Sequence, residues 1–167
     1  MEYPLTCHPD TPPTGVTGVF VTLNRSSLHY RVAGADQLRV PPDALPERTD
    51  GLWRTTCFEL FVRPAGESGY IEYNFAPSGQ WAAYGFSDYR AGMHPLERAT
   101  PPRIGRSGDT WHVDLADPLP RGRLSLTAVI EELDGTRSFW ALAHPAGAPD
   151  FHHADCFAID LTAPHSS

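Results

Sequence analysis

Polar side chains that could hold a small ligand recur in the central third of the chain. The segments CFELFV and YIEYNF carry Glu59, Glu72 and Asn74 among apolar and aromatic residues. Alternate residues of a strand share one face, and facing Cβ atoms of paired strands lie about 5 Å apart. If the two segments pair, the three groups gather on one mixed face. Carboxylate and amide groups beside aromatic rings suit a hydroxyl-rich or planar ligand. The alternative is an ordinary solvent-facing side of an antiparallel sheet.

Two tryptophans and an arginine extend this candidate site. Trp53 and Trp81 stand where a loop meets a strand, so either ring could be a stacking surface for a ligand. Trp111 and Trp140 are instead predicted to pack in the core. Arg90 could direct its guanidinium to a ligand or form a salt bridge.

A third group of candidates lies in the segment AHPAGAPDFHHADCF, which contains His144, His152 and His153. Loops commonly carry functional residues, and imidazole with carboxylate suits transition metals, but this spacing matches no known ligand motif, so no metal is predicted. One histidine could act as a general base with Glu59 or Glu72 as its acid partner. The chain has no nucleophile-elbow motif, so no catalytic residue is assigned. Met93 with His152, or with His144 or His153, could instead supply the axial pair of a haem.

The elements that must position these residues are strands. Short β-branched and aromatic runs cover 16–23, 28–32, 38–40, 56–62, 70–75, 81–86, 123–132, 137–143 and 156–161. The segment 71–90 predicts a hairpin, a second is predicted around Gly108, and Asp134-Gly135 favours a third because glycine accepts positive φ. No window shows a helical stripe. The pattern predicts an all-β, two-sheet antiparallel sandwich, immunoglobulin-like or jelly-roll-like, with about ten strands and little helix. A closed barrel is the second choice.

Length and charge narrow the function further. A chain of 167 residues fits one domain, 1–167, with an irregular arm at 1–14 and a tail at 162–167. The net charge is −7 and the chain has no lysine, which excludes Schiff-base chemistry and argues against nucleic-acid binding. The three cysteines form no C-x-x-C pair and are predicted to be reduced thiols. No signal segment or membrane span is visible, so we expect a cytoplasmic protein that does not bind membranes. The oligomeric state is left open.

Two blocks of the sequence resemble a known family. The segments LWRTTCFELFV, YIEYNFAPSGQWAAYGFSDYRAGM and FWALAHPAGAPDFHHADCFAIDL are similar to the bacterial DOMON-like proteins, which are related to family 9 carbohydrate-binding modules. The resemblance implies a sandwich that binds a sugar or a haem without catalysis. It also implies a sugar held by tryptophan with Glu, Asn and Arg. That places Trp53 or Trp81, Glu59, Glu72, Asn74 and Arg90 at the site. The chain departs from the family in having no export signal and no lysine to ligate haem.

The sequence therefore predicts a non-catalytic domain that binds a small carbohydrate or related polar molecule and needs no cofactor. The predicted ligand-binding residues are Glu59, Glu72, Asn74, Trp81, Arg90, Trp53, His144, His152 and His153. The alternatives are a haem-binding, cytochrome-like domain that uses Met93 and His152, and a small enzyme that uses the His and Glu side chains.

Overall fold

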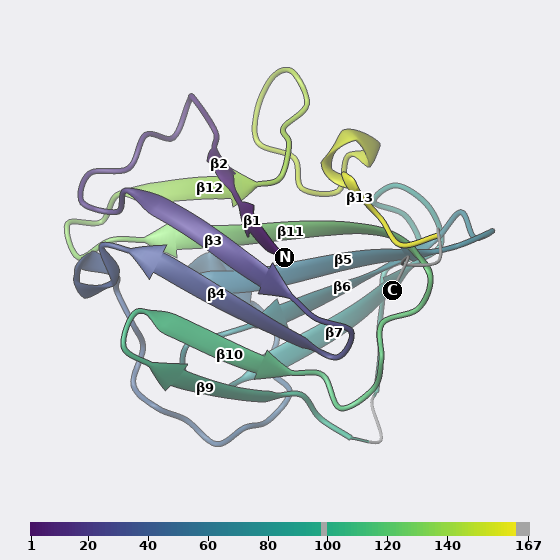
Figure 1. Cartoon of the computed structure of the whole chain (residues 1–167), viewed down its shortest axis with the longest axis horizontal. Helices are drawn as coiled ribbons and strands as arrows, with labels where there is room; N and C mark the ends of the chain where they lie inside the picture. The colour runs from purple at the N-terminus through teal and green to yellow at the C-terminus, as the bar shows by residue number, and fades with distance from the viewer. Residues whose placement is uncertain (98–99, 163–167) are drawn as a thin grey trace.

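The chain folds as a sandwich of two antiparallel sheets (Figure 1). This computed structural model describes residues 1–97 and 100–162. Over these residues the only helical elements are the 3-10 turns η1 (Ala35–Gln37), η2 (Leu52–Arg54) and η3 (Ala154–Cys156), and no helix is long or apolar enough to cross a membrane. The predicted all-β sandwich is confirmed.

The smaller sheet, sheet A, has five strands. Their order across the sheet is β1 (Glu2–Pro4), β3 (Gly18–Leu23), β4 (Ser27–Ala33), β10 (Thr110–Asp114) and β9 (Arg103–Ser107). The hairpin predicted around Gly108 is the β9–β10 turn, where this glycine has a φ of 62°. Residues of β3, β4 and β10 alternate between the core and the surface, as expected for a sheet with one solvated face.

The larger sheet, sheet B, carries most of the candidate residues. Its order is β2 (Thr6–Cys7), β12 (Arg137–Ala141), β11 (Gly122–Glu131), β5 (Cys57–Pro64), β6 (Tyr70–Phe75), β7 (Trp81–Phe86) and β8 (His94–Pro95), with β13 (Ile159–Asp160) paired to β11. The β6–β7 hairpin and the β11–β12 hairpin at Gly135, φ 88°, follow the prediction. In the register, Glu59 faces Asn74 and Thr127 faces Glu59.

The main core lies between the two sheets. Phe58, Leu60 and Val62 of β5 point inward and pack with Tyr30 and Trp111 of sheet A. Trp111 and Trp140 are both buried there, as predicted. Apolar area removed from water contributes about 25 cal/mol per Å², so the burial of this layer stabilises the contact between the sheets.

The outer face of sheet B is also buried. Cys57 and Phe61 of β5 and Tyr70 of β6 join a second apolar cluster with Phe151 and Phe157 from the segment before β13. Glu59 is 3% exposed, Glu72 7% and Asn74 0%. The mixed face predicted from strand alternation is therefore a covered surface and not an ordinary solvent face.

Three predictions of local structure are corrected. The arm at 1–14 contains β1 and β2, because the chain pairs first with β3 and then, past the buried Leu5, with β12. The predicted strand at 156–161 shrinks to β13, because η3 and a bond from Cys156 N to the His153 carbonyl hold its start in a turn. The strand predicted at 38–40 is a single bridge from Leu38 to Glu132. Most of the predicted tail, 163–167, lies outside the described residues.

Candidate functional site

A cavity of about 480 Å³ lies on the outer face of sheet B. Sheet strands supply its floor, and the loops around Trp53, Arg90 and Phe151 supply its walls. Its lining residues are Trp53, Glu59, Glu72, Phe86, Arg90, Met93, Val129, Arg137, Phe139, Pro149, Phe151 and His152. A volume of this size falls within the usual range for small-molecule sites, and an apolar lining with a few convergent polar groups is their usual composition.

Glu59 is a buried carboxyl group in the cavity floor. Its Oε2 accepts a hydrogen bond of 3.0 Å from the Thr127 hydroxyl on the neighbouring strand β11. Burial raises the pKa of Glu59 well above its usual value, and the nearby Glu72 raises it further, against the opposing effect of Thr127. These effects favour the neutral form of Glu59, which can both donate and accept a hydrogen bond.

Glu72 begins a chain of polar contacts that crosses the cavity wall. Its Oε1 lies 3.3 Å from His152 Nε2, and His152 Nδ1 lies 2.7 Å from the Tyr70 hydroxyl. The Tyr70 hydroxyl also accepts a bond of 3.2 Å from the backbone N–H of Arg90. The imidazole is fixed between the rings of Phe61 and Phe86, each at 5.1 Å. Both nitrogens of His152 thus have partners inside the protein.

Arg90 is positioned by an acidic residue of the opposite loop. Its Nη2 donates a bond of 2.8 Å to Asp150, whose other oxygen accepts from the Tyr89 hydroxyl. Arg90 has a positive φ of 49°, which turns its backbone N–H toward Tyr70. The pKa of Asp150 is lowered: burial alone would raise it, but the bonds from Tyr89 and Arg90 outweigh that effect. The contact joins the segment after β7 to the loop that carries His152.

Aromatic and cationic side chains form the rest of the wall. Trp53 is 49% exposed and Met93 57%, so both present apolar surface to solvent beside the cavity. Arg137 Nη2 donates a bond of 3.2 Å to the Trp53 carbonyl, which ties η2 to strand β12. Phe139 and Phe151 pack edge to face with their centroids 5.9 Å apart.

Asn74 lies on the same face of the sheet, beyond the cavity lining. It is fully buried, directly across from Glu59, and neither atom of its amide has a hydrogen-bond partner in the part of the chain that the structure describes. A buried amide without partners is costly. Asn74 is therefore a polar group that a water or ligand beside Glu59 would satisfy.

The nine candidate residues are only partly brought together. Trp53, Glu59, Glu72, Arg90 and His152 line the cavity, and Asn74 lies beside it. The structure corrects the placement of the other three. Trp81 is 4% exposed in the core between the sheets because it shares the inward face of β7 with Ala83. His144 bonds to the Thr6 carbonyl at 2.7 Å and lies against His8 at 5.0 Å, and His153 accepts from Asp155 N as the N-cap of η3.

The haem alternative does not fit these residues. Met93 and His152 both line the cavity, but an axial ligand needs a free ring nitrogen, and both nitrogens of His152 are held by Tyr70 and Glu72. Among the described residues there is also no group of three or more His, Cys, Asp or Glu side chains placed to hold a metal ion.

Several lining residues were not predicted from the sequence. Phe139, Phe151 and Arg137 were overlooked because they reach the cavity from β12 and from the loop before η3, far from Glu59 along the chain. For Arg137 and Phe139 a signal was present, since both lie on one face of a predicted strand. For Phe151 there was none.

Comparison with known proteins identifies the fold. The chain matches no protein-family model and no curated protein sequence. It is similar to the crystal structure of a "putative carbohydrate-binding protein" from Bacteroides uniformis ATCC 8492, with a TM-score of 0.65 and 15% sequence identity. The alignment covers 94% of this chain and 84% of that chain. At this identity the similarity shows that the two proteins share a fold.

Proposed function

We propose that the protein is a binding domain that holds a small carbohydrate, or a related polar ligand, in the cavity on sheet B. The observation that carries the proposal is that Glu59 and Glu72, both nearly fully buried, reach one cavity whose wall includes the exposed ring of Trp53. Carboxyl groups are rarely buried, and here two lie near Asn74, whose amide has no hydrogen-bond partner among the residues that the structure describes.

The cavity offers the contacts that a sugar ring requires. Glu72 can accept a hydrogen bond from a hydroxyl group, and Glu59, whose pKa is raised by burial, can donate one in its neutral form. Arg90 and Arg137 can donate from the wall. Trp53 and Phe139 present flat apolar surfaces on which the C–H faces of a sugar can rest.

The fold supports this proposal. The solved structure with the same fold is named for carbohydrate binding, and the chain resembles DOMON-like proteins and family 9 carbohydrate-binding modules in the segments that line the cavity. Fold likeness is a weaker argument for function than the site itself, so the cavity carries the proposal.

A binding screen tests it. A panel of monosaccharides and disaccharides is offered to the protein while its melting temperature is followed. A ligand at a hundredfold excess over its dissociation constant should stabilise the fold by about 2.7 kcal/mol. Glu72→Gln and Trp53→Ala should reduce the shift, whereas Glu67→Gln, which removes an exposed carboxylate away from the cavity, should not. No shift with any sugar, or shifts that survive both cavity variants, would refute the proposal.

A second candidate function is acid–base catalysis on the same ligand. The observation that favours it is that two carboxyl groups in different surroundings line one cavity: Glu59 is buried beside Thr127, and Glu72 lies 3.3 Å from His152. Glycoside hydrolysis uses a pair of carboxyl groups, one as the acid and one as the base or nucleophile. Release of nitrophenolate from aryl glycosides measures this activity. Hydrolysis that disappears in Glu59→Gln would favour the enzyme, and binding without hydrolysis would favour the binding domain.

A further inference from the structure

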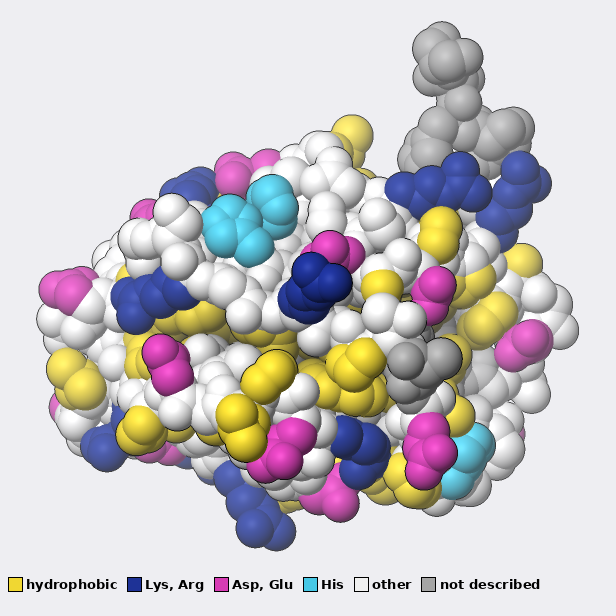
Figure 2. Space-filling model, turned by 90° about the horizontal axis from the view of Figure 1, so that it is seen from below, with side chains coloured by type: hydrophobic (Ala, Val, Ile, Leu, Met, Phe, Trp, Pro, Cys, Tyr) yellow, Lys and Arg dark blue, Asp and Glu magenta, His cyan; other side chains and the backbone are white. Residues whose placement is uncertain are grey.

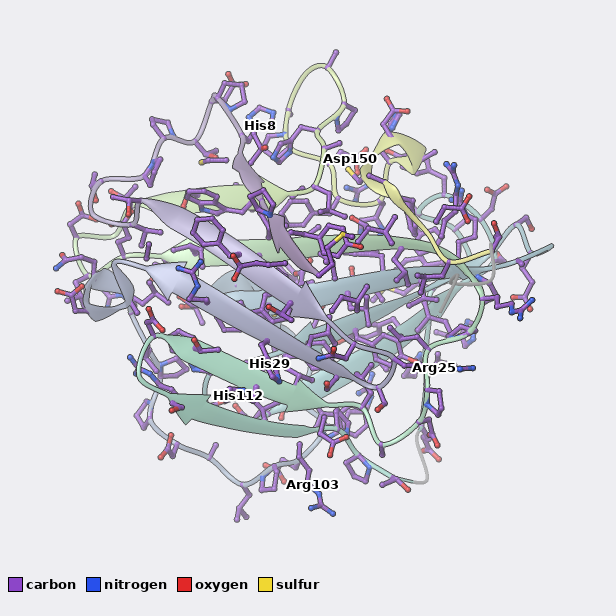
Figure 3. All side chains as sticks on the ribbon, viewed as in Figure 1. His8, Arg25, His29, Arg103, His112 and Asp150 are labelled. Atoms are coloured by element: carbon purple, nitrogen blue, oxygen red, sulfur yellow. The ribbon has the colours of Figure 1, made fainter. Side chains whose placement is uncertain are left out.

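A pair of histidines lies on the other sheet, away from the cavity. His29 of β4 and His112 of β10 are direct partners across sheet A, and their ring centroids lie 4.5 Å apart at an angle of 79°. Both side chains are half-buried on the outer face of the sheet. Figure 3 shows His29 and His112 side by side, far from Asp150, which lies beside the cavity. In the space-filling view of Figure 2, histidine side chains (cyan) gather on the surface.

The polar atoms of the two imidazole rings are not used in contacts within the part of the protein that the structure describes. Among the described residues, neither imidazole forms a hydrogen bond or an ion pair, whereas His8, His144 and His152 all do. Each ring therefore keeps its nitrogen atoms available to a ligand outside the chain.

We propose that His29 and His112 form a binding site for a divalent transition metal ion, with water in the remaining coordination positions. Imidazole nitrogen suits Ni²⁺, Cu²⁺ and Zn²⁺.

The spacing of the pair meets the requirements of such a site. Nitrogens bind these ions at about 2.0–2.1 Å, so two nitrogens on one ion stand about 3 Å apart. Rings 4.5 Å apart on neighbouring strands can bring two nitrogens to this separation by rotating about their side-chain torsions. The rigid ladder of β4 and β10 fixes their Cα positions.

The surroundings leave space for coordinated water. The residue across from His112 on β9 is Gly105, and no atom lies within 4 Å of where its Cβ would be. Across from His29 on β3 is Thr22, a small side chain. The nearby cation Arg31 is paired with Glu2 at 3.2 Å, which reduces its repulsion of a metal ion.

Titration of the full chain, without an added histidine tag, tests the site. Ni²⁺ is the probe, because Cu²⁺ would also oxidise free thiols. Calorimetry at pH 7.5 should show one equivalent of Ni²⁺ bound. Its affinity should fall at least tenfold in His29→Gln and in His112→Gln, and no further in the double variant. His94→Gln, which removes an exposed histidine elsewhere, is the matched control and should bind as the wild type does.

A second measurement does not depend on variants. Ni²⁺ is paramagnetic, so substoichiometric ion should broaden the imidazole NMR signals of His29 and His112 before those of any other histidine. Absence of a site with a stoichiometry of one, unchanged affinity in His29→Gln, or earlier broadening of another histidine would overturn the proposal. None of these outcomes bears on sugar binding at the cavity.

Discussion

His152 Nε2 lies 3.3 Å from Glu72 Oε1, and this contact joins the loop before η3 to the middle of strand β6. The same imidazole binds the Tyr70 hydroxyl at 2.7 Å. One side chain thus sets the position of the loop that forms a wall of the cavity.

Removal of this imidazole should weaken both the fold and the site. His152→Ala removes the contact of Glu72 with the imidazole and leaves the Tyr70 hydroxyl with only the bond from Arg90 N–H. A buried group left unsatisfied costs about 1–3 kcal/mol. Urea unfolding should show this loss of stability. His152→Phe keeps the packing against Phe61 and Phe86 and separates the lost packing from the lost hydrogen bonds. Equal stability of His152→Ala and the wild type would contradict the role given to this residue.

Glu59 should make the stability of the protein depend on pH. Its pKa is raised in the folded state, first by burial and then by Glu72, so the folded protein binds more protons than the unfolded chain above about pH 4.5. The contribution of Glu59 is therefore complete below pH 4.5 and is lost as the pH rises, at up to about 1.4 kcal/mol per pH unit. Glu59→Gln, which keeps an acceptor for Thr127, should be more stable than the wild type at pH 8. Melting curves at pH 4.5 and pH 8 measure the difference, and a gain of equal size at both values would argue against this origin.

Replacement of Trp53 should affect ligand affinity, whereas replacement of Trp81 should affect the stability of the fold. Trp53→Ala removes a half-exposed ring from the cavity wall, so ligand affinity should fall by two- to tenfold, as expected for a stacking contact of about 0.5–1.5 kcal/mol, while the melting temperature stays nearly constant. Trp81→Ala creates a void in the core and should cost about 3–5 kcal/mol. Calorimetric titration with a sugar from the screen and thermal unfolding check the two effects. A stable Trp81→Ala protein would place that ring outside the core.

The ionised form of Glu132 should stabilise the fold at neutral pH, and this stabilisation should be lost at acidic pH. Its carboxylate accepts backbone bonds from Thr14, Gly15 and Val16, at 2.5–3.0 Å, and is 1% exposed. Burial raises its pKa, but these bonds have the larger combined effect and lower it. Its contribution is present above the usual value of 4.5 and is lost as the pH falls through the lowered value.

Glu132→Gln should therefore lose about 1.5–3 kcal/mol at pH 7, the usual worth of a bond to a charged group. Its stability should approach that of the wild type at pH 3. Urea denaturation at both pH values measures this, and Glu67→Gln, which removes an exposed carboxylate between β5 and β6, serves as the control. An equal loss at pH 3 would mean that charge is not the cause.

The sequence predicted the parts of the fold that depend on local rules. Alternation in 58–62 and 70–75 assigned Phe58 and Leu60 to one face and Glu59 and Glu72 to the other, because a strand permits no other arrangement. The turn at Gly135 was predicted from the dipeptide Asp134-Gly135, because glycine accepts the positive φ that the structure shows there. The two-sheet class followed from many short strands separated by turns.

The sequence could not predict what depends on packing between distant segments. In β7, WAAYGF has small or aromatic residues on both faces, so the pattern could not tell that Trp81 faces the core and Tyr84 faces outward. His152 and His153 are neighbours in sequence, but only His152 contacts the sheet, because η3 turns His153 to the surface. The short strands β1 and β2 have too few residues to show any period.

The cavity lies on the outer side of sheet B, while the main core lies between the sheets. Along β5, Phe58 and Leu60 pack into the core between the sheets, whereas Glu59 lines the cavity on the opposite face. A substitution at Glu59 therefore alters the cavity and leaves the side chains that pack between the two sheets in place. A ligand could therefore enter and leave the cavity without any separation of the two sheets.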